Sequence, residues 1–214
     1  MNINDFFKIS DPRVDNIGGF PLHPEWWSRG YEYPWALSFA RPGEIIADMG
    51  CGWSPRPLKD VLAKIAGQVY AIDKDKRVLQ LPVHDNLCLV QADFAKQPPD
   101  TTRLFADGYF DKIFCISVLE DLNDMVPAAL REFARLIKPG GKIIMTFDVK
   151  YNLDAPAGPY PGVNLPEFMV DNIFSGDLGL RFHGDVFTDK SNAVVHPNWN
   201  LCCYHCVLTR RRNV

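Results

Sequence analysis

Two glycines with one residue between them follow an acidic residue at the end of an apolar run. The run is Ile45 to Ala47, and Asp48, Gly50 and Gly52 follow it. Glycine lets the backbone turn tightly and lets a ligand approach the chain closely. A helix that begins just behind such a turn presents unpaired N–H groups to an anionic or polar ligand. The segment therefore predicts a loop that binds a nucleotide-type cofactor at the end of the first strand of an α/β sheet.

Acidic residues recur at the ends of the next apolar runs. Asp73 follows one such run about twenty residues after the glycines, where a carboxylate accepts hydrogen bonds from ribose hydroxyls. Asp93 follows the next run and is succeeded by Phe94. NAD and S-adenosylmethionine both contain a ribose, so Asp73 alone does not choose between them.

Three details favour S-adenosylmethionine over NAD. A dinucleotide loop needs a third glycine where this chain has Pro55, and proline obstructs the close packing of helix on strand. Asp48 stands two residues before the first glycine, where a dinucleotide loop needs no acid. Asp93 and Phe94 offer an acceptor and an aromatic face, which suit an adenine ring.

Five segments between residues 44 and 148 resemble, in order and spacing, the motifs of class I S-adenosylmethionine-dependent methyltransferases. Two positions depart from that pattern. Ser54 replaces a glycine that is often present, and Asp121 stands where many relatives carry histidine. The segments are Asp48 to Gly52, Asp73, Ala92 with Asp93, Phe110 to Glu120, and Leu136 to Lys142.

The resemblance implies a cofactor site at the carboxyl ends of the first four strands. Asp48 would help to hold the glycine loop and the methionine ammonium group. Asp73 would bind the ribose hydroxyls, and Asp93 would accept from the adenine amino group. The residues expected to bind the cofactor are Asp48, Gly50, Cys51, Gly52, Asp73, Lys74, Asp93, Phe94, Ile116 and Ser117.

Alternation of apolar runs with helical patterns predicts a single-domain, Rossmann-like, doubly wound α/β fold. We expect a mostly parallel, seven-stranded sheet with helices on both faces. Residues 1–40 are expected to form an aromatic cap segment, and residues 41–214 the cofactor-binding domain. The strands are expected near 44–48, 68–72, 87–91, 111–117, 142–147, 181–187 and 201–210. Helices are expected near 34–40, from Ser54 and Pro55 onward, near 76–81, from Asp124 to Ile137, and from Asn164 onward.

The cap segment is rich in aromatic residues, among them Trp26, Trp27, Tyr31, Tyr33 and Trp35. It has two interpretations, a wall of the acceptor site or a hydrophobic cover packed on the sheet. The segment 150–163 is rich in proline, glycine and tyrosine and is a candidate lid.

Methyl transfer from a sulfonium is a direct displacement, which requires alignment of the reactants and exclusion of water. A base is needed only where the acceptor keeps a proton that it does not lose unaided. Candidate bases or orienting groups are Asp148, Tyr151, His183 and His196.

The acceptor is expected to be a small molecule. A net charge of −3 gives no electrostatic case for binding nucleic acid or an anionic membrane. Residues Ser117 to Glu120 also differ from the N-P-P-Y pattern typical of enzymes that methylate nucleobase amines. Two other interpretations remain, an NAD-dependent oxidoreductase and an S-adenosylmethionine-binding protein without catalysis.

The compartment is expected to be the cytoplasm. The chain begins with a polar, acidic segment that lacks the features of a signal peptide, and no apolar run approaches the length of a membrane span.

No metal site is expected at the cysteine-rich segment near the end of the chain. Side chains alternate along a strand, so Cys203 and His205 would lie on one face and Cys202 and Cys206 on the other. The sequence does not specify an oligomeric state.

Overall fold

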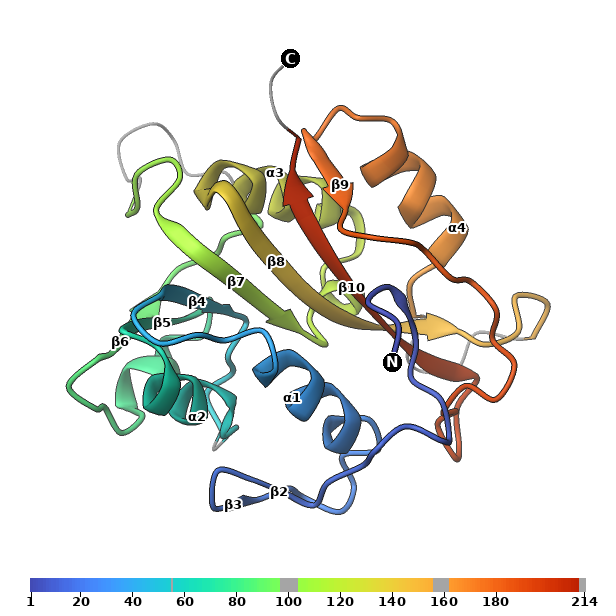
Figure 1. Cartoon of the computed structure of the whole chain (residues 1–214), viewed down its shortest axis with the longest axis horizontal. Helices are drawn as coiled ribbons and strands as arrows, with labels where there is room; N and C mark the ends of the chain where they lie inside the picture. Colours follow the sequence, from blue (N-terminus) through green and yellow to red (C-terminus); the bar gives the residue numbers. More distant parts are fainter. Residues whose placement is uncertain (55, 97–103, 156–161, 212–214) are drawn as a thin grey trace.

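A twisted central sheet organises the molecule, which the computed structural model describes for residues 1–54, 56–96, 104–155 and 162–211 (Figure 1). The strand order is β1-β10-β8-β7-β4-β5-β6, and β9 pairs with β10. Apart from the small β2–β3 hairpin (Asn16–Ile17 and Phe20–Pro21), all described strands belong to this sheet. Its strands are β1 (Asp5–Phe6), β4 (Ile45–Met49), β5 (Gln68–Asp73), β6 (Leu87–Gln91), β7 (Phe110–Ile116), β8 (Ile137–Lys150), β9 (Leu180–Phe182) and β10 (Leu201–Arg210).

The five strands β4 to β8 are mutually parallel, whereas β10 runs antiparallel to β8. The carboxyl ends of the parallel strands therefore meet at one edge of the sheet, as expected for a doubly wound fold. The seven strands predicted from the sequence correspond to β4 to β10, and the fold class is confirmed. The eighth strand, β1, comes from the N-terminal segment and pairs Asp5 and Phe6 with the far side of β10.

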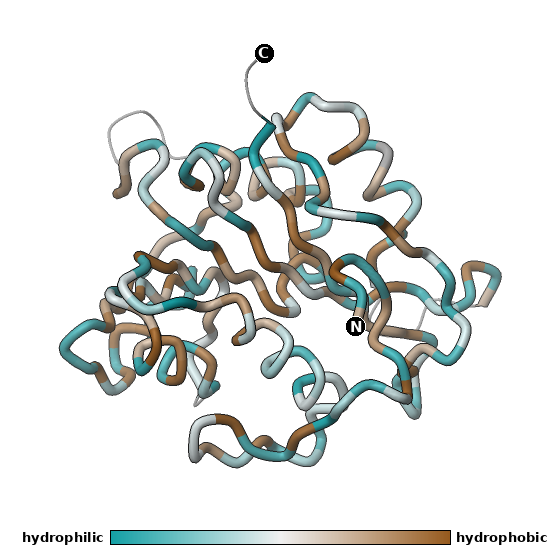
Figure 2. Tube along the Cα trace, in the orientation of Figure 1, coloured by the Kyte–Doolittle hydropathy of each residue, from teal (hydrophilic) through white to brown (hydrophobic). Residues whose placement is uncertain are grey.

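Helices cover both faces of the sheet and divide the core in two. Helices α1 (Arg29–Leu37) and α2 (Leu58–Ile65) pack with Phe114 and Ile144 on one face. Helices α3 (Val126–Leu136) and α4 (Leu165–Phe168) pack with Phe147 on the other face. Apolar residues accordingly concentrate along the central strands (Figure 2). Short helical turns complete the fold: η1 (Lys76–Gln80), η2 (Leu119–Asp121), η3 (Asn123–Met125) and the π-helical turn η4 (Met169–Phe174).

Helix α1 begins at Arg29, earlier than the predicted start near residue 34, so the expected boundary was wrong. Pro34 lies inside the helix, where its missing N–H leaves the carbonyl of Gly30 without a helical donor. The N–H of Val14 donates to that carbonyl at 3.0 Å. A neighbouring segment thus compensates for the proline and lets the helix extend across it.

The expected start of helix α2 was also wrong. Helix α2 begins at Leu58 with Pro57 at its N-cap, so Ser54 does not cap it. Instead, the Ser54 carbonyl accepts from the N–H of Arg56 at 2.6 Å in a tight turn, and Pro55 lies outside the described residues. The start of α4 was confirmed, since Asn164 is its N-cap, although the Asn164 side chain makes no capping hydrogen bond.

Candidate active site

A pocket opens at the carboxyl edge of the parallel strands and brings together residues from four separate strand ends. Most of the sequence-predicted cofactor residues line it: Gly50, Gly52, Asp73, Lys74, Asp93, Phe94 and Ser117. Arg56, Val118, Asp121 and Leu122 complete the lining. The other three predicted residues, Asp48, Cys51 and Ile116, have buried side chains beside the loop.

The glycine loop adopts a backbone that other residues rarely adopt. Gly50 and Gly52 have φ values of 74° and 73°. A Cβ atom on Gly50 would lie 2.6 Å from Cγ2 of Val118, which is too close for a real contact. Position 50 therefore requires glycine both for its dihedral angle and for the space it leaves.

Asp73 holds the glycine loop against the end of β5. Its Oδ2 accepts from the N–H of Gly52 at 2.8 Å, and its Oδ1 accepts from the N–H of Asp75 at 2.9 Å. An ionised carboxylate has about four acceptor positions, so both oxygens keep capacity for further donors such as ribose hydroxyls. Asp73 is thus oriented toward the pocket by two backbone groups.

Asp93 and Phe94 close the neighbouring side of the pocket. Oδ1 of Asp93 accepts from the N–H groups of Ala95 and Lys96, each at 3.2 Å, and fixes the turn after β6. One side of the half-buried Phe94 ring packs on Phe133, with 5.3 Å between ring centroids. An acceptor and an aromatic surface therefore stand together, as the sequence predicted.

Asp48 is a buried carboxyl beneath the loop, only 4% exposed. Burial raises its pKa to about 7, against the opposing effect of Lys59 and Arg56. Burial, together with Asp48 itself, also raises the pKa of the Cys51 thiol, which keeps that thiol protonated at neutral pH. A cationic group placed beside Asp48 would favour the ionised carboxylate.

A buried polar cluster joins helix α1 to the strand ends, and sequence analysis missed it. Glu32 is fully buried, and its Oε1 accepts from Ser117 Oγ at 2.6 Å and from Thr146 Oγ1 at 2.5 Å. Arg29 forms an ion pair with Glu32 and also donates to Ser117 Oγ at 2.5 Å. Burial alone would raise the pKa of Glu32, but Arg29 and the two hydroxyl groups lower it below its usual range. Glu32 is therefore a stable carboxylate paired with Arg29.

Asp148 and Glu120 are a second pair of carboxyl groups next to this cluster. Burial and the nearby Glu32 raise the pKa of Asp148 to about 7. Burial and Asp148 raise the pKa of Glu120 well above its usual range. Among the described residues, Oδ1 of Asp148 and Oε2 of Glu120 are buried without a hydrogen-bond partner. Asp148 can thus accept a proton near neutral pH, and Glu120 holds its proton more tightly than an exposed glutamate does.

The other predicted bases are placed less favourably. His183 donates its backbone N–H to Val207 beside β9, at the edge of the sheet opposite the pocket. Tyr151 is 41% exposed on the loop after β8. Nδ1 of His196 accepts from the N–H groups of Asn198 and Trp199, each at 3.1 Å, and burial lowers the pKa of His196. Of the four candidates, the structure brings Asp148 to the carboxyl edge with the polar cluster.

The aromatic cap segment serves largely as a cover. Tyr33 and Trp35 are 2% and 7% exposed and belong to the core beneath α1. Trp27 packs against His196, with 5.2 Å between ring centroids. Among the described residues, no helix combines the length and the apolarity that a membrane span requires.

Comparison with known proteins identifies the family. A family model described as a methyltransferase domain matches residues 47–145. The ubiquinone biosynthesis O-methyltransferase of Xanthomonas euvesicatoria pv. vesicatoria is 31% identical over 160 residues, which are 68% of this chain and 66% of that protein. The chain belongs to the class I S-adenosylmethionine-dependent methyltransferases. The sequence had left NAD as an alternative cofactor. Membership of this family decides for S-adenosylmethionine.

Other curated relatives match this chain over a shorter stretch. The ubiquinone biosynthesis O-methyltransferase of Xanthomonas campestris pv. campestris is 31% identical over 112 residues, 52% of this chain and 46% of that protein. The chain thus spans about half the length of such relatives.

Solved structures show the same fold at low sequence identity. The [4+2]-cyclase SpnF has a TM-score of 0.66 and 14% identity, covering 99% of this chain and 88% of that chain. A methyltransferase from Aquifex aeolicus has a TM-score of 0.58 and 20% identity, covering 86% of this chain and 93% of that chain. A third structure is the 1,6-didemethyltoxoflavin-N1-methyltransferase of Burkholderia thailandensis, which has S-adenosylhomocysteine bound. Its TM-score is 0.58 and its identity 14%, and the match covers 88% of this chain and 80% of that chain.

Proposed function

We propose that this protein transfers the methyl group of S-adenosylmethionine to a small-molecule acceptor, with Asp148 as the general base. The proposal depends chiefly on one observation. The pocket lined by Gly50, Gly52 and Asp73 shares the carboxyl edge of the sheet with Asp148, whose Oδ1 is buried without a partner among the described residues and which interacts electrostatically with Asp121 of the pocket lining. A cofactor site and a group able to take a proton therefore share one edge of the sheet.

The pocket residues suit the parts of the cofactor. The backbone at Gly50 and Gly52 would lie close to the amino-acid end and the ribose, since neither residue has a side chain in the way. Asp48 would face the methionine ammonium, and Asp73 would accept from the ribose hydroxyls. Asp93 would accept from the adenine amino group beside Phe94, with Lys74 at the rim. Ser117 would contact the methionine portion, and Cys51 and Ile116 would contribute through their backbone.

When bound, S-adenosylmethionine would supply a methyl carbon on a positively charged sulfur: an acceptor's lone pair would bond to that carbon while the carbon–sulfur bond breaks, and neutral S-adenosylhomocysteine would leave. Asp148 would take the proton that the acceptor hydroxyl or amine loses. With a pKa of about 7, its ionised form is available at neutral pH and is basic enough to help. Ser117, held by Glu32 and Arg29, would keep the end of β7 in place during the reaction.

Two observations support a small-molecule acceptor. The curated relatives are named for ubiquinone biosynthesis, which concerns a small molecule. The net charge of −3 provides no basic surface for a nucleic acid. In this proposal residues 1–40 cap the domain formed by residues 41–214, and α1 supplies the cluster that supports Ser117.

Binding without methyl transfer is a second candidate, because a neighbour with this fold is named as a cyclase. One experiment separates the two. The protein is incubated with methyl-tritiated S-adenosylmethionine and a cell extract divided into small-molecule, protein, RNA and DNA fractions. We expect label in the small-molecule fraction with an equal amount of S-adenosylhomocysteine. Label in a macromolecular fraction, or cofactor binding without S-adenosylhomocysteine formation, would contradict the proposal.

A further inference from the structure

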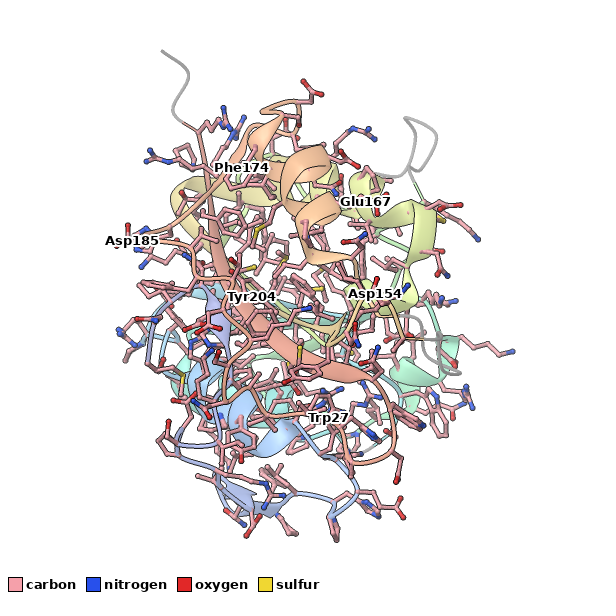
Figure 3. The ribbon with its side chains drawn as sticks, turned by 90° about the vertical axis from the view of Figure 1, so that its right-hand side faces the viewer. Trp27, Asp154, Glu167, Phe174, Asp185 and Tyr204 are labelled. Atoms are coloured by element: carbon pink, nitrogen blue, oxygen red, sulfur yellow. The ribbon has the colours of Figure 1, made fainter. Side chains whose placement is uncertain are left out.

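A second pocket lies on the other side of the segment that lines the cofactor pocket. Val118, Asp121 and Leu122 face the cofactor pocket, whereas Leu119 and Glu120 line the second one. Its volume is about 530 Å³, within the usual range for small-molecule sites. Its other walls come from the start of α3 and from α4 with η4, and Figure 3 shows Glu167 on the side of α4 near α3. The pocket is thus large enough for a small organic ligand beside the proposed methyl-transfer centre.

The titratable side chains described in the lining of this second pocket are all carboxyl groups. Its acidic lining residues are Asp124, Glu167, Asp171 and, with a pKa held well above its usual range, Glu120; no lysine, arginine or histidine is among the described residues that line it. Asp124, Glu167 and Asp171 are exposed at the rim, while Glu120 lies deeper. Such a rim attracts a cation and disfavours an anion.

Two buried acceptor atoms at this pocket point independently to a ligand. Asn172 is 8% exposed, and its Nδ2 donates to the carbonyl of Phe168 at 3.2 Å. Its Oδ1 and the Oε2 of Glu120 are buried without a partner among the residues that the structure describes. Leaving a buried acceptor without a partner destabilises the protein, and a bound donor relieves that cost. Oδ1 of Asn172 therefore offers a vacant acceptor position to a ligand that donates a hydrogen bond, and Glu120 lines the same pocket.

The arrangement fits an organic cation better than a metal ion. Within the described ranges, no three His, Cys, Asp or Glu side chains are grouped so that they could hold a metal. A primary ammonium group carries three N–H donors and one positive charge. Its organic portion would pack on the apolar residues of the lining, Leu119, Val126, Pro127, Val163 and Phe168.

We propose that this pocket binds an ammonium group of the methyl acceptor, so that the substrate is an amine-bearing small molecule. The inference rests on the proposed methyltransferase function and names the substrate class. Glu120 links the two sites, since it lines the ammonium pocket and interacts electrostatically with Asp148. An acceptor held by its ammonium group at Asn172 and Glu120 would extend toward Asp148.

Three probes that share a phenol ring test this proposal in calorimetric titrations with S-adenosylhomocysteine present. Tyramine carries an ammonium group, tyrosol a neutral hydroxyl, and 3-(4-hydroxyphenyl)propanoate a carboxylate. We expect tyramine to bind about tenfold more tightly than tyrosol, the propanoate to bind most weakly, and the preference to shrink at high salt. Equal affinities, or no binding of tyramine, would overturn the proposal.

Matched variants localise the site. Asp171→Asn and Glu167→Gln should each weaken tyramine binding about three- to tenfold and leave tyrosol binding unchanged. Asp177→Asn, an exposed change outside the pocket lining, should change neither. If both pocket variants bind tyramine like the unmodified protein, the pocket is not the ammonium site. Titration with S-adenosylmethionine in the same series tests the methyltransferase proposal separately, because its binding does not depend on these carboxylates.

Discussion

Ser117 donates a hydrogen bond from its Oγ to Oε1 of Glu32 at 2.6 Å, joining residues 85 positions apart. Ser117 stands directly after β7 with a φ of 48°, which is rare for a residue other than glycine. Its Oγ also accepts from Arg29. Helix α1 therefore fixes a strained residue at the rim of the cofactor pocket.

Removing the charge of Glu32 should destabilise the protein strongly. Glu32→Gln leaves Arg29 buried without its anionic partner, so we expect the free energy of unfolding to fall by about 3 kcal/mol. Ser117→Ala should reduce it by about 1–2 kcal/mol, and the double variant by less than the sum. Urea denaturation measures all three. Glu25→Gln, exposed on the same segment, is the control and should change little. Additive effects would contradict the coupling between Glu32 and Ser117.

Gly50→Ala should impair both stability and cofactor binding more than a matched glycine substitution. Gly43 has a similar φ of 78°, but a Cβ there meets nothing within 4 Å, so Gly43→Ala reports the cost of the dihedral angle alone. That cost is about 1–2 kcal/mol. Gly50→Ala adds the contact with Val118, and we expect a larger loss in the same denaturation experiment. Equal losses for the two variants would show that the space at Gly50 is unimportant.

Asp148→Asn should stabilise the protein at alkaline pH. The folded pKa of Asp148, about 7, is raised above the unfolded value near 4, so the folded state holds the proton more tightly. The wild type therefore loses stability as pH rises from about 4 to about 7, and the variant escapes this loss. The full shift would correspond to about 4 kcal/mol, which partial solvent exposure reduces to about 1–2 kcal/mol.

Thermal or urea unfolding at pH 4 and pH 8 checks this prediction. The variant and the wild type should be about equally stable at pH 4, and the variant should be more stable at pH 8. Asp177→Asn, at an exposed position, keeps Asp148 and should therefore match the wild type at both pH values. A variant that is less stable at pH 8 would contradict the assignment of Asp148 as an unpartnered buried acid.

The same substitution should slow methyl transfer. Without the carboxylate, the rate with a protonated acceptor should fall about 100-fold while the affinity for S-adenosylmethionine stays unchanged. In the wild type the rate should rise with pH through about 7 as Asp148 loses its proton, and this inflection should be absent from the variant. Initial-rate measurements across this pH range decide the point; an unchanged inflection in the variant would assign it to another group.

The sequence predicted the parts of the site that are local to each strand end. Gly50, Gly52, Asp73 and Asp93 follow apolar runs directly, so strand periodicity alone placed them at one edge. Arg29 and Glu32 were missed because their partners Ser117 and Thr146 lie 85–114 residues away, and no local pattern marks such contacts. The start of α1 was misplaced because proline is favoured in the first turn of a helix and disfavoured inside one, so Pro34 was taken as the first helical residue.

The pairing of Asp148 with Glu120 was also beyond local reasoning. Asp148 was named among four candidate bases, whereas Glu120 was quoted only within a family motif. Their pKa values depend on burial by segments distant in sequence, including the one that carries Glu32. Only the assembled sheet brings these groups together.

Calorimetric titration of S-adenosylmethionine into the unmodified protein and Asp73→Ala tests the central claim most directly. Asp177→Ala, exposed and outside the pocket, serves as the control. We predict micromolar binding to the unmodified protein and the control, and a loss of at least about tenfold in Asp73→Ala, because Asp73 both holds Gly52 and faces the ribose position. Equal affinity in all three folded proteins, or no binding to the unmodified protein, would contradict the account.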